Sequence, residues 1–470
     1  MARKIIPIVD AGSAEVGLYE ASRKIYPRTV RGMFARWRWA MVFLTQLVFY
    51  GLPWIEWGER QMVLFDLAAR RFYVFALVLY PQDLIYLSGL LVISALALFL
   101  FTAVAGRLWC GYACPQTVYT EIFMWIEHRI EGNRTARMRL DGEPLSTEKL
   151  VKKWFKHIVW IGVAMWTGFT FVGYFTPIRD LGLAFLQTRM GSWEVFWVFF
   201  YGFATYGNAG FMREQVCKYM CPYARFQSAM FDRDTLVVGY DPRRGEPRAP
   251  RRKGVEPRTL ALGDCIDCGL CVQVCPTGID IRDGLQYECI GCGLCVDACD
   301  TVMQKMAYPP GLIRYDTQNG MESGRSRREA LRRVLRPRVL VYAGVLLLLV
   351  SGLLASLIVR TPFKVDVVRD RASLARIVEG GRLENVYRLQ IMNATESPQR
   401  YRITAEGPRG LSVSPDEPVA VDAAQSRWVA VRLQVPYDAV PAGSHEVHFV
   451  IHEEHSGVRL SEKAAFLVPR

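Results

Sequence analysis

Five long stretches without a charged residue constrain this sequence more than any other feature. They lie between Arg38 and Glu56, Asp83 and Arg107, His157 and Arg179, Glu194 and Arg213, and Arg338 and Arg360. The hydrocarbon core of a bilayer is spanned by about 20 apolar residues in a helix. The sequence therefore predicts five transmembrane helices, at about 39–55, 84–106, 158–178, 195–212 and 339–359. A shorter apolar stretch from Phe72 follows two arginines, and we expect it to lie at the membrane interface.

The positive charges predict how these helices are oriented. Residues 1–38 carry eight Lys and Arg and residues 107–156 carry nine, whereas 57–83 carry three and 176–193 carry two. Since Lys and Arg are enriched in cytoplasmic loops, the N-terminus, the loop 107–156 and the segment 213–337 are predicted to be cytoplasmic. The same bias explains the net charge of +13, so we expect no nucleic-acid partner. The first 38 residues lack the early apolar core of a signal peptide, so the first helix should remain as a membrane anchor.

The spacing C-x2-C-x2-C-x3-C occurs twice, from Cys265 and from Cys289. In bacterial ferredoxins this run binds two 4Fe-4S clusters, and the fourth cysteine of each run serves the other cluster. We therefore expect cluster 1 on Cys265, Cys268, Cys271 and Cys299, and cluster 2 on Cys289, Cys292, Cys295 and Cys275. Zinc is the alternative for paired C-x2-C, but it needs no interleaved third cysteine. A ferredoxin domain is predicted at about 258–315, with Gly269 and Gly293 providing tight ligand loops. Asp300 stands where a second proline would be expected and removes no ligand.

The other four cysteines form two C-x-x-x-C-P motifs, Cys110 with Cys114 and Cys217 with Cys221. Each motif follows a predicted span that runs inward, so both should lie at one depth on the cytoplasmic side. Residues four apart share a helix face, and the following proline loosens the turn. Four thiolates together, or each pair alone, suit a soft ion such as Cu(I). The alternatives are inert small side chains, a redox-active dithiol, or packing against the ferredoxin segment.

Weaker candidates accompany these motifs. Supplementary soft or imidazole ligands are available at His128, His157, Met212 and Met220. Lone histidines and methionines in such segments more often have structural roles. Since all 12 cysteines lie in spacing motifs, the pattern favours metal ligation in a reducing compartment over a disulfide framework.

Beyond the fifth span, residues 360–470 alternate apolar and polar side chains in short segments separated by Gly, Pro and Asp. This pattern predicts an all-β, immunoglobulin-like sandwich, which the odd number of spans places in the periplasm. Four histidines fall in one segment: His445, His448, His452 and His455. They could bind external copper or zinc, but solvated polar residues on an exposed strand are the preferred interpretation. The predicted fold is a multi-domain membrane protein: a five-span helical bundle, a cytoplasmic dicluster ferredoxin domain and a periplasmic β-sandwich.

Three long strings resemble one family. "GRLWCGYACPQTVYTEIFMWIEHRIEG", "CKYMCPYARFQSAMFDRDTL" and the segment "LGDCIDCGLC" through "LCVDACD" resemble the cytochrome c oxidase accessory proteins CcoG, FixG and RdxA. The resemblance implies a bacterial inner-membrane ferredoxin-like protein that reduces Cu(II) to Cu(I) for assembly of a haem-copper oxidase. It implies copper as substrate, with a copper-exporting P-type ATPase, copper chaperones and oxidase subunits as partners, and leaves the cytoplasmic electron donor unidentified. The resemblance also places Cys110, Cys114, Cys217 and Cys221 at the family's C-x-x-x-C-P positions.

Two other functions fit the same motifs. A quinol-linked membrane ferredoxin of the NapH or NosR type would use these cysteines for a different redox centre and would oxidise a quinol. A non-enzymatic scaffold for oxidase assembly would carry structural clusters, and loss of cluster ligands would then unfold it. Whether the purified protein reduces Cu(II) or instead oxidises a quinol analogue discriminates between a cupric reductase and a quinol-linked ferredoxin.

Overall fold

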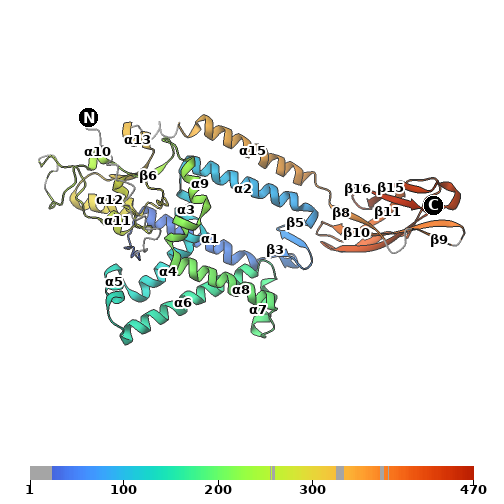
Figure 1. Ribbon diagram of the computed structural model, residues 1–470, viewed down its shortest axis with the longest axis horizontal. Coiled ribbons are helices and arrows are strands. Elements are labelled where there is room, and N and C mark those ends of the chain that lie inside the picture. Colours follow the sequence, from blue (N-terminus) through green and yellow to red (C-terminus); the bar gives the residue numbers. More distant parts are fainter. Residues whose placement is uncertain are drawn as a thin grey trace, which may run out of the picture.

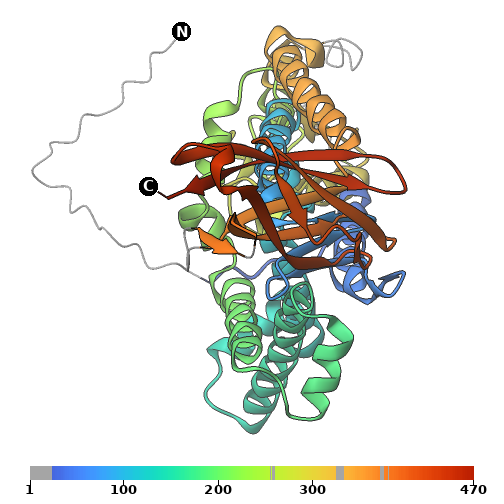
Figure 2. The same cartoon turned by 90° about the vertical axis from the view of Figure 1, so that its right-hand side faces the viewer.

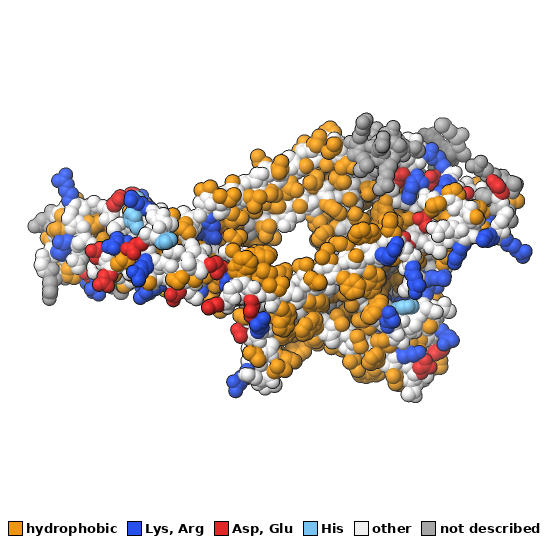
Figure 3. Space-filling model, turned by 180° about the vertical axis from the view of Figure 1, so that it is seen from behind, with side chains coloured by type: hydrophobic (Ala, Val, Ile, Leu, Met, Phe, Trp, Pro, Cys, Tyr) orange, Lys and Arg blue, Asp and Glu red, His pale blue; other side chains and the backbone are white. Residues whose placement is uncertain are grey.

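The computed structural model describes residues 24–254, 256, 260–323, 333–370, 375–378 and 380–469. The chain forms an elongated molecule with the cysteine-rich segment at one end and the C-terminal β-sandwich at the other (Figure 1). Helices run between the two ends: α1 (Met33–Gly51), α2 (Leu84–Ala105), α4 (Pro115–Glu131), α6 (Thr147–Val172), α8 (Ser192–Thr205) and α15 (Pro337–Ile358). Hydrophobic side chains cover this middle region, whereas charged side chains gather toward both ends (Figure 3).

Three helical segments in the described part of the chain are long and apolar enough to cross a membrane. They are Pro81–Ala105, Thr147–Val172 and Pro337–Ile358. The first and last contain α2 and α15, which pack side by side along the molecule (Figure 1). These helices match the predicted spans 84–106 and 339–359 to within two residues at each end. The total of five spans stays a prediction.

Several helices differ in length from the predicted spans and loops. The span expected at 158–178 belongs to α6, which starts at Thr147 because Ser146 caps it by accepting from the Lys149 N–H at 3.2 Å. The span expected at 195–212 is α8 only as far as Thr205 and then becomes a π-helix, η3 (Tyr206–Met212). The span expected at 39–55 lies in α1, which ends at Gly51 before a short 3₁₀ turn, η1 (Leu52–Trp54). The loop expected at 107–156 is largely helical and includes α3 (Leu108–Tyr112), α4 and α5 (Arg134–Gly142).

The segment expected at the membrane interface forms a small antiparallel sheet. Its strands are β3 (Val63–Asp66), β4 (Arg71–Val74) and β5 (Leu77–Leu79), next to the short pair β1 (Glu56–Trp57) and β2 (Arg60–Gln61). Tyr73, Val78 and Tyr80 pack against Met392 and Ala424 of the C-terminal domain. The C-terminal β-sandwich therefore packs against this small sheet.

The C-terminal domain is a two-layer β-sandwich. One sheet has the order β12-β14-β10-β8, with β9 paired to β10, and the other has the order β13-β11-β15-β16. The strands are β8 (Phe363–Arg369), β9 (Arg376–Val378), β10 (Arg382–Asn393), β11 (Gln399–Glu406), β12 (Ser412–Ser414), β13 (Val419–Val421), β14 (Ser426–Pro436), β15 (Gly443–Glu453) and β16 (Arg459–Val468). Tyr387, Phe449 and Phe466 are fully buried between the sheets. Figure 2 shows both layers from the end of the molecule.

The cysteine-rich segment is compacted by a two-stranded sheet and short helices. Strands β6 (Val237–Tyr240) and β7 (Ile313–Asp316) pair, and the helices are α10 (Pro242–Gly245), α11 (Leu270–Gln273), η6 (Ile281–Asp283), α12 (Leu294–Met306) and α13 (Gln318–Ser323). Gly269 and Gly293 precede α11 and α12 with φ of +65° and +74°, a conformation open to glycine, as expected for the tight loops. Helix α1 is fixed to this segment because the Phe34 and Ala35 N–H groups donate to Asp297 of α12, at 3.2 and 2.8 Å.

Candidate redox site

The eight cysteines of the two long runs line two cavities in the cysteine-rich segment. The first cavity is bordered by Cys265, Cys268, Cys271 and Cys299. The second is bordered by Cys275, Cys289, Cys292 and Cys295, with Cys271 at its edge. The fold thus brings the fourth cysteine of each run to the first three of the other run, which is the crossed set expected for two clusters. Four thiols around each cavity match the ligand requirement of a 4Fe-4S cluster, so the residues present fit that group.

The two C-x-x-x-C-P motifs do not form the single helical turns that we expected. Cys110 lies on the short helix α3, but Cys114 has φ −60° and ψ 127° and precedes α4. Cys217 lies on a π-helix, η4 (Val216–Met220), and Cys221 is extended before α9 (Pro222–Met230). The reason is that proline excludes the α-conformation from the residue before it and favours the first position of a new helix. Each motif is consequently a helix break.

Despite these breaks, the four thiols of the two motifs lie within electrostatic range of one another. Burial raises the pKa of Cys110 to about 11 and that of Cys217 to about 12, and the neighbouring cysteines add to both shifts. The Cys110 thiol donates to the buried Gln227 side chain at 3.3 Å. Across the described residues, no three His, Cys, Asp or Glu side chains converge as ligands of a single ion. The motif cysteines are therefore near neighbours without a preformed mononuclear site.

Helix α3 packs directly on the loop that carries the ligands of the second cluster. A Cβ atom on Gly111 would lie 2.8 Å from the Ile290 carbonyl oxygen and 2.9 Å from Cys292 Cα. The Tyr112 hydroxyl donates to the Cys292 carbonyl at 3.0 Å. Only a residue without a side chain permits this approach, so Gly111 sets the contact between the first motif and the loop that carries Ile290 and Cys292.

The second motif is joined to the same loop through Tyr287 and Arg107. The Tyr287 hydroxyl donates to the Lys218 carbonyl, between Cys217 and Cys221. Arg107 is buried and donates to the carbonyls of Tyr287 and Ala224. Its guanidinium interacts electrostatically with Cys110, Cys217 and Cys289, and in each case it favours the thiolate. The buried Arg107 side chain therefore stabilises the thiolate form of cysteines in both motifs and of Cys289, a proposed ligand of cluster 2.

The weaker ligand candidates have other contacts. His128 Nδ1 lies 3.1 Å from the Gly132 carbonyl, and His157 Nδ1 lies 2.9 Å from the Tyr206 hydroxyl. Met220 is exposed at the end of η4, and Met212 ends η3. On β15, His448 pairs with Glu446 at 3.0 Å, and His445 contacts the Pro441 carbonyl. The structure brings none of these side chains into a metal-binding group with others in the described part of the chain.

Sequence reasoning missed the residues that join the two halves of the site: Arg38, Arg107, Gly111, Tyr112 and Tyr287. Arg38 is 2% exposed, interacts with Cys292 and pairs with Glu121 at 2.8 Å. An arginine next to each predicted membrane boundary looks like an orientation signal, so no local feature marked Arg38 or Arg107 as part of a redox site.

Domain comparisons match three parts of this arrangement. A 4Fe-4S dicluster domain matches residues 212–318, and a 4Fe-4S binding domain matches residues 87–133, which include Cys110 and Cys114. An immunoglobulin-like fold found at the C-terminus of FixG matches residues 353–469. Together with the apolar helices, these matches define a class of iron–sulfur proteins with candidate membrane spans and an immunoglobulin-like C-terminal domain.

Within that class, the chain belongs to the FixG/RdxA family. It is 39% identical over 430 residues to the nitrogen fixation protein FixG of Rhizobium meliloti, covering 85% of this chain and 82% of that protein. It is 38% identical over 441 residues to the RdxA protein of Cereibacter sphaeroides, covering 90% of this chain and 92% of that protein. A crystal structure of a FixG-related protein from Vibrio parahaemolyticus, at 20% identity and a TM-score of 0.22, covers 23% of this chain and 97% of that one. The two sequence relatives, FixG and RdxA, confirm the resemblance seen in the sequence.

Proposed function

We propose that this protein passes electrons from two 4Fe-4S clusters to Cu(II) bound at the C-x-x-x-C-P cysteines. Cu(I) is the product, and it is used in assembling a haem-copper cytochrome c oxidase. The observation that supports this proposal is the contact of α3 with the cluster 2 loop, where Gly111 lies against Ile290 and Cys292. This contact places the proposed acceptor site next to Cys292, a proposed ligand of cluster 2.

The roles of the residues follow from their positions. Cys265, Cys268, Cys271 and Cys299 would hold one cluster, and Cys289, Cys292, Cys295 and Cys275 the other. When bound, such clusters supply one-electron transfer. Cys110, Cys114, Cys217 and Cys221 offer soft sulfur ligands, which prefer Cu(I) and so favour the reduced product. Arg107 stabilises thiolates on both sides of the contact.

We further propose the membrane arrangement and the partners. Five spans place the N-terminus and the cluster segment in the cytoplasm and the sandwich in the periplasm of a bacterial inner membrane, as the loop charges favour. A copper-exporting P-type ATPase, copper chaperones and oxidase subunits would supply or receive the metal. Reporter fusions test the arrangement. A periplasm-dependent reporter should be active after residue 469 and inactive after residue 323.

Replacing Cys110 and Cys217 together with alanine tests the copper step. We expect both cluster signals in electron paramagnetic resonance to be retained and the rate of Cu(II) reduction by the dithionite-reduced protein to fall at least tenfold. Replacing His448 and His452 with alanine is the control and should change neither. Copper reduction at the wild-type rate in the cysteine variant would refute the proposed site.

A further inference from the structure

An aromatic cavity of about 780 Å³ lies among α1, α4 and α6, apart from the cysteine sites. Its lining comes from three helices: Trp39, Val42, Phe43, Gln46 and Tyr50 of α1, Ile122 and Trp125 of α4, and Gly162, Val163 and Trp166 of α6. The α6 residues belong to the segment that can cross a membrane. Phe43 and Trp166 are exposed at its rim, so the cavity opens on the apolar surface of the molecule. Its size is that of a small-molecule site.

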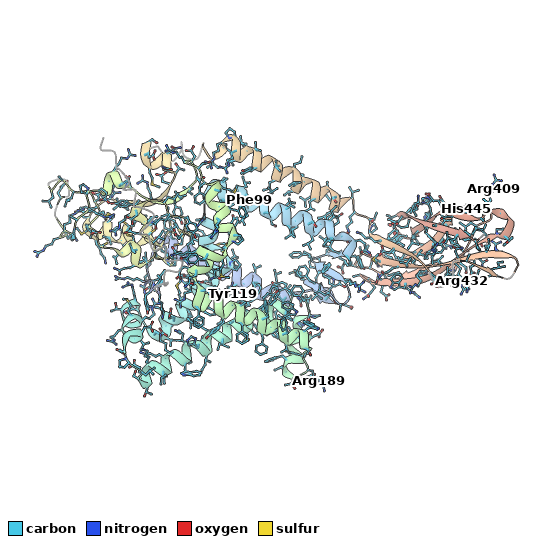
Figure 4. All side chains as sticks on the ribbon, viewed as in Figure 1. Phe99, Tyr119, Arg189, Arg409, Arg432 and His445 are labelled. Atoms are coloured by element: carbon cyan, nitrogen blue, oxygen red, sulfur yellow. The ribbon has the colours of Figure 1, made fainter. Side chains whose placement is uncertain are left out.

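The cavity contains polar groups that an acyl chain would not need. The Gln46 amide oxygen is buried and has no hydrogen-bond partner among the described residues. The Tyr50 hydroxyl lies 2.8 Å from the Thr167 hydroxyl, and Tyr119 interacts with Tyr50, Gln46 and Thr167. Tyr119 lies on α4 in the centre of the helical region (Figure 4). A buried acceptor without a partner is costly, and a ligand hydroxyl would satisfy it.

Helix α1 connects this cavity to cluster 2. Gln46 and Arg38 lie about two turns, or about 12 Å, apart on α1. Arg38 interacts with Cys292, and Trp39 stands beside Trp125 with ring centroids 6.2 Å apart. Both tryptophans also border a second, more polar cavity of about 280 Å³, which reaches Pro276 and Leu294 of the cysteine-rich segment. Trp39 and Trp125 thus border both cavities, and Arg38, which borders the polar cavity, interacts with Cys292.

We propose that the aromatic cavity binds an isoprenoid quinol, which is the electron donor to the clusters. A quinol has a flat ring for the aromatic lining, two hydroxyls for Gln46 and Tyr50, and an apolar tail for the open rim. Arg38 and Arg107, which both interact with cluster 2 cysteines, would stabilise the added electron and so raise the reduction potential toward the quinol's.

Oxidation of the quinol to the quinone would break two O–H bonds and release two electrons, one for each of the 4Fe-4S clusters that the eight cysteines would hold and that would each accept one electron. The two protons go to water in the polar cavity, which Glu121 and His128 border. Each electron then reduces one Cu(II), so one quinol yields two Cu(I). This last step rests on the proposed function, whereas quinol binding and cluster reduction do not.

Filling the cavity tests the inference in the full-length, cluster-loaded protein. A Cβ on Gly162 meets no atom within 4 Å, so Gly162→Leu should occupy the cavity without disturbing the helices. Gly344→Leu is the matched control, because Gly344 is equally open on α15. Binding of menadione is measured by quenching of tryptophan fluorescence, and cluster reduction by menadiol is measured by electron paramagnetic resonance. In Gly162→Leu, we expect both affinity and reduction rate to fall at least tenfold, and in Gly344→Leu, neither to change.

The outcomes separate the two proposals. Equal menadiol reduction in Gly162→Leu and the wild type, or no menadione binding by the wild type, would overturn the quinol site. Dithionite-reduced Gly162→Leu should still reduce Cu(II) at the wild-type rate. If dithionite-reduced wild-type protein leaves Cu(II) unchanged while menadiol reduces its clusters, the copper proposal fails and the quinol site stands.

Discussion

At the scale of single residues, Gly111 permits the close approach of the first C-x-x-x-C-P motif to the cluster 2 loop. The Cβ of Gly111→Ala would lie 2.8 Å from a backbone oxygen that cannot rotate away. We therefore expect this variant to separate α3 from the loop and to slow Cu(II) reduction by the dithionite-reduced protein about tenfold or more, a loss of about 1.4 kcal/mol in transition-state stabilisation. Stopped-flow bleaching of the cluster absorbance measures the rate.

The matched control for Gly111→Ala is Gly142→Ala, because a Cβ at Gly142 of α5 meets no neighbour within 4 Å. That variant should transfer electrons as the wild type does. Iron content should be unchanged in both variants, since neither glycine belongs to a ligand loop. Wild-type electron transfer in Gly111→Ala would mean that this contact does not set the rate.

At the scale of elements, the grouping of the eight cysteines around two cavities could be predicted because the spacing within each run is local. The first three thiols of each run are three positions apart and face one loop interior, and Gly269 and Gly293 adopt the left-handed conformation that such loops need. We expected Cys110 and Cys114 to share one helical turn. The turn does not form because Pro115 disfavours the α-helical conformation at Cys114, which is extended and ends the helix. The contact of α3 with Ile290 could not be predicted, because it joins segments that are distant in sequence and the hydrophobic periodicity of each segment gives no information about such contacts.

Buried ion pairs around Glu127 of α4 join this helix to α5, to α6 and to Arg213. Arg137 and Arg213 lie 3.2 and 2.9 Å from this carboxylate, and Lys156 lies 3.7 Å away. Burial alone would raise the pKa of Glu127, but these cations and Lys24 outweigh it and hold the pKa at about 2. Its contribution to stability is therefore full above the unfolded pKa of 4.5 and is lost as the pH falls toward 2.

Glu127→Gln should lower the stability at pH 7 by about 3 kcal/mol, because it leaves buried cations without their counter-ion. Thermal unfolding in detergent, followed by circular dichroism, measures the change. The wild type should approach the variant's stability as the pH falls from 4.5 toward 2. Glu148→Gln is the control, since its pair with Lys152 is exposed, and it should leave the unfolding temperature unchanged. An equal decrease of the unfolding temperature in both variants would show that burial of the ion pairs around Glu127 does not increase their contribution to stability.

At the scale of the whole molecule, a buried carboxylate joins the sandwich to the helices. Asp83 is 2% exposed where α2 begins, and it pairs with Arg360 at 2.6 Å and with Lys364. Tyr80 strengthens the junction by donating to the Asn393 carbonyl at 2.9 Å. These contacts hold the segment between α15 and β8 against the start of α2. Sequence patterns alone indicate only that this segment connects a helix to a strand.

Asp83→Ala should therefore loosen the sandwich without unfolding it. Loss of the buried partner of Arg360 costs about 3 kcal/mol, which increases the detached population about a hundredfold. Trypsin cleaves after Arg360, and its rate follows the open population when closing is fast, so cleavage there should accelerate in the variant. Glu396→Gln is the matched control, because it removes an ion pair with Arg60 across the same junction in which the carboxylate is exposed, and such pairs contribute less than buried ones. Cleavage after Arg360 at equal rates in the two variants would show that Asp83 does not hold the domains together.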